Sequence, residues 1–167
     1  MHRSGRLTGI AVLGALLMGC NHPSTTTSSA STSQAATGPA KPAATADENT
    51  WGNYLAEVGK LHGEDVGMRP YIYVIPAGDS VAATARRQNE TDSVVHSIGP
   101  ILMPGGMLIV GGPDPKQTTA FLGDVAKHVK PDALKGIVVM VVSDGFEHAA
   151  VANMLKASGA TVRFVTM

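Results

Sequence analysis

Four short apolar runs recur along the C-terminal two-thirds of the chain. They cover residues 71–75, 107–110, 137–142 and 161–165. Runs of four to six residues have the length of strands, and continuous apolar runs are typical of strands that are buried on both faces. The pattern therefore predicts a parallel sheet with helices packed against it.

The segments around these runs have helical spacing. Apolar residues three and four positions apart predict an amphipathic helix over 51–62, in which Trp51, the only tryptophan, docks the helix on the rest of the fold. Similar spacing predicts helices over 115–129 and 145–158. The second of these ends at Gly159, a residue well suited to terminate a helix.

The segment between the first two strands has a weaker pattern. Eight consecutive polar residues, 86–93, separate two stretches with helical spacing. Two alternatives follow: a broken helix, or a long polar loop followed by a short helix that starts near Thr91.

The order of these elements predicts a small Rossmann-like three-layer α/β/α domain. Its four-stranded parallel sheet is preceded by one N-terminal amphipathic helix. The run 137–142 is the most apolar and belongs at the centre of the sheet, whereas the last run carries Arg163 and belongs at an edge. With right-handed crossovers, the strand order 2-1-3-4 meets both demands, and the order 3-2-1-4 would place the most apolar strand outside. We therefore expect the order 2-1-3-4.

Polar residues follow the strands at the edge where parallel sheets bind ligands. In the order 2-1-3-4 a crevice lies beyond the carboxyl ends of strands 1 and 3. Asp79, Asp144 and His148 would lie there, where carboxylates and an imidazole could act as general acid and base. The alternative is structural: Asp79, Asp114 and Asp144 are N-caps of helices, and His148 is an exposed first-turn residue. Pro115 directly after Asp114 favours capping at that position.

Three cations form a second candidate site, for an anion: Arg86, Arg87 and Lys116. If the two arginines lie in a loop, they could hold a phosphate or a carboxylate, and if they lie in a helix, they form a solvated face. The histidines lack the spacing of metal ligands, and no glycine-rich phosphate loop follows a strand. The sequence therefore predicts neither a metal site nor a bound cofactor.

The N-terminal segment has the parts of a secretory signal. Arg3 and Arg6 supply positive charge, and residues 7–18 form an apolar run that is too short to span a bilayer. The segment closes with the tetrapeptide Leu17-Met18-Gly19-Cys20. This tetrapeptide resembles the lipobox of bacterial lipoproteins.

The resemblance implies cleavage before Cys20, lipidation of its sulfur and attachment to a membrane through N-terminal acyl chains. Asn21, in the place where Asp favours the inner membrane, implies a periplasm-facing protein of the outer membrane in the bacterial cell envelope. We accordingly divide the chain into a signal peptide (1–19), a lipidated cysteine with a flexible tether rich in Ser, Thr, Ala and Pro (20–48), and an α/β domain (49–167).

Charge and motifs limit the function. Residues 49–167 carry 10 Lys and Arg against 11 Asp and Glu, a formal net charge of −1, which argues against nucleic acid as a partner. Because no complete catalytic motif is present, the sequence favours a binding or interaction module for an envelope protein or a small molecule. The alternative is a small periplasmic hydrolase or phosphoryl-handling enzyme that uses Asp79, Asp144 and His148.

The substitution Cys20→Ser is expected to abolish incorporation of fatty acid, because the first acyl group is attached through the cysteine sulfur. Metabolic labelling with radioactive palmitate and immunoprecipitation of the chain measures this loss, with the wild-type protein as the positive control. Label that persists in the variant would rule out acylation at Cys20.

Overall fold

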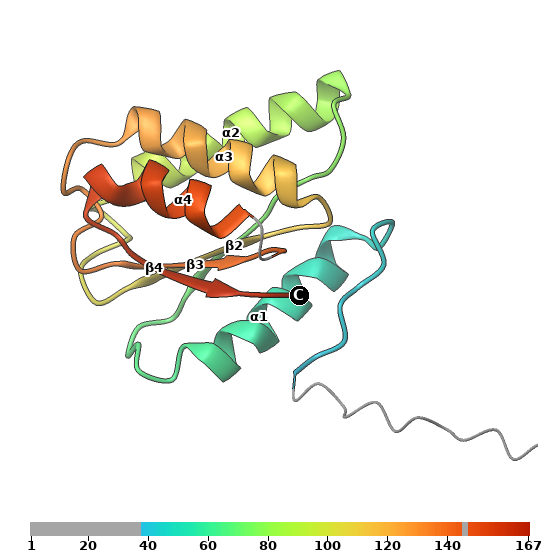
Figure 1. The fold of residues 1–167 in the computed structure, drawn as a ribbon, viewed down its shortest axis with the longest axis horizontal. Helices are drawn as coiled ribbons and strands as arrows, with labels where there is room; N and C mark the ends of the chain where they lie inside the picture. The colour runs from blue at the N-terminus through green and yellow to red at the C-terminus, as the bar shows by residue number, and fades with distance from the viewer. Residues whose placement is uncertain (1–37, 145–146) are drawn as a thin grey trace, which may run out of the picture. The chain divides into compact units, whose positions relative to one another are not determined.

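The computed structural model describes residues 38–144 and 147–167. The predicted signal peptide, the lipobox from Leu17 to Cys20 and the tether up to residue 37 lie outside these described residues. Within them the chain forms four α-helices and a four-stranded sheet in which all strands are parallel (Figure 1). None of the described helices is both long enough and apolar enough to cross a bilayer.

Helices and strands alternate along the described chain. Their bounds are α1 Glu48–His62, β1 Tyr71–Val74, α2 Val81–Ser97, β2 Met107–Gly111, α3 Pro115–His128, β3 Val138–Val142, α4 His148–Leu155, the 3₁₀ turn η2 Lys156–Ser158 and β4 Thr161–Val165. Figure 1 shows α2, α3 and α4 together on one face of the sheet and α1 on the other. The predicted three-layer α/β/α class and its N-terminal helix are thus confirmed.

The strands lie in the order β1-β2-β3-β4, so the expected order 2-1-3-4 is wrong. Two premises of that expectation hold, since β3 is internal and β4, which carries Arg163, is at an edge. The error concerns the first two strands. All residues of β2 are buried, whereas all residues of β1 are only half-buried, as befits an edge strand.

The sequential strand order β1-β2-β3-β4 has a physical reason. Right-handed crossovers that add each strand on the same side of the previous one place α2, α3 and α4 on one face. The helix that precedes the sheet, α1, then covers the other face, and the winding need not reverse. The crevice expected between strands 1 and 3 therefore does not form, because β2 lies between β1 and β3.

Alternate residues of the strands pack into two separate cores. In β2, Leu108 and Val110 join the cluster beneath α2, α3 and α4, whereas Met107 and Ile109 join the cluster beneath α1. Trp51 lies in the second cluster with 1% of its surface exposed, so it docks α1 on the sheet as predicted.

The segment after β1 is one continuous helix, α2, rather than a broken helix or a loop. Only Thr91 and Val94 of this helix are buried, so the polar run at 86–93 faces largely toward solvent. Contacts between side chains within the helix support that face, such as the approach of Arg86 Nε to Glu90 Oε1 at 3.8 Å.

Two segments of backbone approach each other closely just beyond β2. A Cβ added at Gly112 would overlap the carbonyl oxygen of Ile75, at the end of β1. The neighbouring Gly111 is also crowded, since a Cβ there would lie 2.8 Å from Leu55 Cδ2 and 2.9 Å from the carbonyl oxygen of Val142. Glycine is required at Gly112 because the obstacle is backbone, which cannot move aside alone.

Gly112→Ala is expected to destabilise the protein by about 1–3 kcal/mol, the usual range for inserting a methyl group into a filled space. Gly67→Ala is the matched control, because a Cβ at Gly67 meets no atom within 4 Å. Urea unfolding of the two variants and the wild type measures both free energies. Equal stability of the two variants would contradict the close approach of Gly112 to Ile75.

Candidate functional site

Asp79 belongs to a small polar network at the carboxyl edge of the sheet. Its Oδ1 accepts a hydrogen bond from Gln117 Nε2 at 2.7 Å and lies 3.6 Å from Arg87 Nη2. Arg87 Nη1 also donates to the carbonyl oxygens of Pro76 and Gly78, at 3.1 and 2.6 Å. The side chain of Arg87 is 13% exposed and that of Asp79 is 85% exposed. The arginine is therefore held by the loop after β1, whereas the carboxylate faces solvent.

Asp144 and His148 have separate surroundings. Asp144 Oδ1 lies 3.7 Å from Lys41 Nζ. The half-buried His148 ring stacks on Phe164 of β4, with ring centroids 4.1 Å apart, and its Nε2 is buried with no hydrogen-bond partner in the described chain. No hydrogen bond or ion pair within residues 38–144 and 147–167 joins Asp79, Asp144 and His148 to one another.

N-capping is confirmed for Asp114. Its Oδ1 accepts from the backbone N–H groups of Lys116 and Gln117, at 2.9 and 3.4 Å, and these are two of the otherwise unpaired donors at the start of α3. The capping interpretation is wrong for Asp79, and for Asp144 it stays a prediction because the structure does not describe residues 145–146, which follow it. Ser80 caps α2 in place of Asp79.

The arginines of the predicted anion site have partners within the domain. Arg86 Nη2 donates to Glu48 of α1, and this hydrogen bond raises the pKa of Arg86 above its ordinary value. Arg87 is bound to the carbonyl groups after β1. Lys116 is exposed at the start of α3. These contacts link α1, α2 and the loop after β1 at the carboxyl edge.

On the β4 side, Arg163 fastens the end of α1 to the sheet. It donates through both terminal nitrogens to the Asp65 carboxylate, with both distances 2.8 Å, and also to the carbonyl oxygen of His62. The hydrogen bond from Arg163 lowers the pKa of Asp65, and the same contact raises the pKa of Arg163. The loop after α1 is thus tied to β4, at the opposite edge of the sheet from β1.

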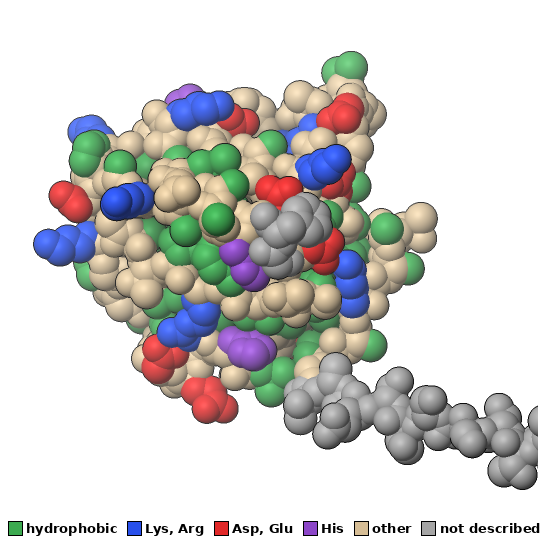
Figure 2. Space-filling view, viewed as in Figure 1, with side chains coloured by type: hydrophobic (Ala, Val, Ile, Leu, Met, Phe, Trp, Pro, Cys, Tyr) green, Lys and Arg blue, Asp and Glu red, His purple; other side chains and the backbone are tan. Residues whose placement is uncertain are grey.

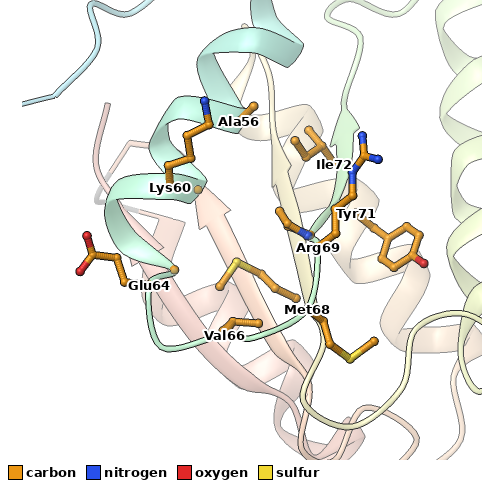
Figure 3. Close-up of a pocket in the computed structure, with 12 residues that line it drawn as sticks. Ala56, Lys60, Glu64, Val66, Met68, Arg69, Tyr71 and Ile72 are labelled. Atoms are coloured by element: carbon orange, nitrogen blue, oxygen red, sulfur yellow. The ribbon is translucent and has the colours of Figure 1, made fainter.

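On the β1 side, a groove of about 860 Å³ lies between α1 and β1. Ala56 of α1, Ile72 of β1 and Met107 of β2 give it an apolar lining, and the loop 63–70 lines it where α1 turns toward β1. In Figure 3 the Arg69 side chain extends along β1, whereas the Glu64 carboxylate points away from the other labelled side chains.

A second hollow of about 290 Å³ continues along β1 and shares Ile72 with this groove. Asn53 of α1, Val74 of β1 and Glu90 of α2 are among its lining residues. Because α1 and α2 belong to opposite helical layers, a hollow lined by both must pass around the outer edge of β1. We call the two hollows together the edge groove.

Sequence reasoning missed the edge groove because it placed β1 inside the sheet. A local signal was present nonetheless. Four small residues recur at helical spacing along α1 and at its C-cap: Gly52, Ala56, Gly59 and Gly63. Three of them line the groove of about 860 Å³ and Gly52 lines the second hollow, so this side of α1 presents little bulk to the groove.

Comparison of the chain with protein-family models, with curated proteins and with solved structures gave no match.

Asp114→Ala is expected to destabilise the protein by about 0.5–2 kcal/mol, the usual effect of removing an N-cap. Asp124→Ala on the same helix is the matched control, because the half-exposed Asp124 side chain pairs within the described residues only with Lys127, at 2.8 Å, and such surface pairs contribute little. Thermal unfolding of both variants measures the difference. An effect of Asp124→Ala as large as that of Asp114→Ala would contradict the capping role.

Proposed function

We propose that the chain is a lipid-anchored protein of the bacterial cell envelope whose α/β domain binds a partner in the edge groove. The single observation that carries the binding role is this groove, which is open, has a largely apolar larger hollow and a more polar smaller one, and lies beside an edge strand. Concave apolar sites with a few polar groups are the usual place for binding on a protein surface.

The anchoring part of the proposal rests on the N-terminal sequence. Leu17-Met18-Gly19-Cys20 supports lipidation at Cys20, and Asn21 supports the outer membrane with the domain facing the periplasm. The predicted tether between Cys20 and the domain would let the groove reach a partner away from the membrane surface. A protein of the envelope is the partner that this placement favours over a free small molecule.

The distribution of charge supports a protein partner rather than a nucleic acid. Residues 49–167 have a formal net charge of −1, and Figure 2 shows acidic and basic side chains interspersed on one face of the described domain. Binding to nucleic acid depends on a dense basic face that neutralises several phosphates.

The enzymatic alternative has less support in the geometry. A hydrolase or phosphoryl-handling enzyme would use Asp79, Asp144 and His148 together, whereas each of these has its own neighbours: Arg87 with Gln117, Lys41, and Phe164. General acid–base catalysis needs such groups within reach of one reacting atom.

Photocrosslinking in cells tests the proposed binding site. The photoreactive residue p-benzoylphenylalanine is placed at Asn53 of α1, which lines the edge groove, or at Asn153 of α4 as the matched control. Both asparagines are exposed. We expect a cross-linked adduct from position 53 and none from position 153, and loss of that adduct when Cys20→Ser removes the anchor. An absence of adduct at position 53, or equal adducts at both positions, would refute the role of the edge groove.

A further inference from the structure

The outer edge of β1 presents backbone groups without partners. The Ile75 N–H donates to the carbonyl oxygen of Gly111 in β2 at 2.8 Å, so Ile75 directs its backbone groups toward β2. Successive residues of a strand direct these groups to opposite sides, so Ile72 and Val74 direct theirs away from β2. No hydrogen bond from residues 38–144 or 147–167 reaches the outward groups of Ile72 and Val74. The edge can therefore accept one more strand.

The two helical layers leave room for such a strand once it displaces the exposed Arg86–Glu48 ion pair, which joins the layers at the carboxyl end of β1. The hollow around the β1 edge lies between Asn53 of α1 and Glu90 of α2. A strand added in the plane of the sheet would run about 4.8 Å from β1 and would direct every second side chain toward α1. Those side chains would enter the apolar groove of about 860 Å³.

A residue at one end of this groove, Arg69, carries a free cation that extends along β1 (Figure 3). Arg69 directly precedes Pro70 at the amino end of β1, is exposed, and makes no ion pair or hydrogen bond through its side chain within the described chain. The other described arginines are all paired with carboxylates: Arg86 with Glu48, Arg87 with Asp79 and Arg163 with Asp65. A guanidinium binds a carboxylate through two parallel hydrogen bonds, so Arg69 is suited to an anionic group of a ligand.

The connection between α1 and β1 decides which carboxylate fits. Residues 63–70 join the two elements and line the groove at the amino end of β1, so a bound chain meets this loop there. A polypeptide that ends beside Arg69 avoids the loop, whereas a polypeptide that continues must turn away from the sheet. The free C-terminus of a partner therefore fits better than an internal Asp or Glu.

We propose that the edge groove binds the C-terminal segment of a partner protein as a fifth strand, antiparallel to β1. The outward backbone groups of Ile72 and Val74 pair with the segment, apolar side chains of the segment fill the groove, and its terminal carboxylate binds Arg69. The antiparallel direction follows from the position of Arg69, because only a strand that runs opposite to β1 ends at the amino end of β1. This inference rests on the proposed function and specifies its ligand.

A second copy of this chain is a less suitable occupant. Pairing of β1 with β1 from another copy would bring no terminal carboxylate to Arg69, because β1 lies within the chain and not at its end. The chain's own C-terminus is also engaged elsewhere, since Met167 packs against the core beneath α1.

Selection from a peptide library tests the proposal with a defined probe. The full chain, purified in detergent micelles, is offered random octapeptides that are fused to the C-terminus of a carrier and end in a free carboxylate. We expect recovered peptides to bind with apolar residues at alternate positions. Each is then synthesised with a free and with an amidated C-terminus, and we expect amidation to weaken binding at least tenfold.

Variants identify the recognising residue. Arg69→Gln is expected to weaken binding of the free-carboxylate peptide at least tenfold and to leave the amidated peptide unaffected. Lys130→Gln, which removes an exposed cation in the segment after α3, is the matched control and should leave both affinities unchanged. Circular dichroism of each variant checks that the fold is retained.

Amide hydrogen exchange followed by NMR reports strand addition directly. We expect the amides of Ile72 and Val74 to gain at least tenfold protection when the peptide is bound. The proposal is overturned if no peptide is recovered, if amidation or Arg69→Gln has no effect, or if these two amides stay unprotected in the complex. Protection that rises with protein concentration and without peptide would assign the edge to a second copy instead. If position 53 still forms its adduct in cells after any of these outcomes, the proposed function stands and only this ligand is wrong.

Discussion

A single helix, α1, covers one face of a four-stranded sheet and is narrower than that sheet. The arrangement of this protein's surface depends on this difference in width. An α-helix with its side chains is about 10 Å across, whereas the axes of four strands span roughly 14 Å. Glycines seat α1 closely on β2: a Cβ at Gly59 would overlap the Ile109 side chain, and one at Gly63 would lie 2.8 Å from Met107 Cε. A helix in that position leaves hollows on both of its sides, one beside β1 and one of about 560 Å³ beside β4.

The two hollows differ in the parts of the chain that line them. Beside β4, the C-terminal Met167 and residues 38–41 line the hollow, and Arg163 ties the loop after α1 to the strand through Asp65. Beside β1, the edge groove contains an unpaired cation, Arg69, and the outward backbone groups of an edge strand. The asymmetry follows from topology, since α1 connects directly to β1 and its loop can close only one end of that groove.

The kinds of elements were largely predictable because periodicity is a local property. The helix over 51–62 was recovered as α1, and the apolar runs became β1 to β4 within a residue or two. The capping role of Asp114 was also predictable, since the cap and its N–H partners are neighbours in sequence. The polar run at 86–93 obscured α2, because a helix that buries only Thr91 and Val94 has little apolar periodicity to detect.

The sequence by itself determined an α/β domain with four parallel strands and an N-terminal helix, because these follow from patterns within short windows. Only the tertiary structure decided the strand order, and with it the open edge at β1 and the separate surroundings of Asp79, Asp144 and His148. Those features depend on which surfaces meet between segments some 35 residues apart, as in the pairing of Tyr71 with Leu108. The orders 2-1-3-4 and 1-2-3-4 both place the apolar strand β3 inside the sheet. The choice between them therefore depends on how the helices are distributed over the two faces of the sheet.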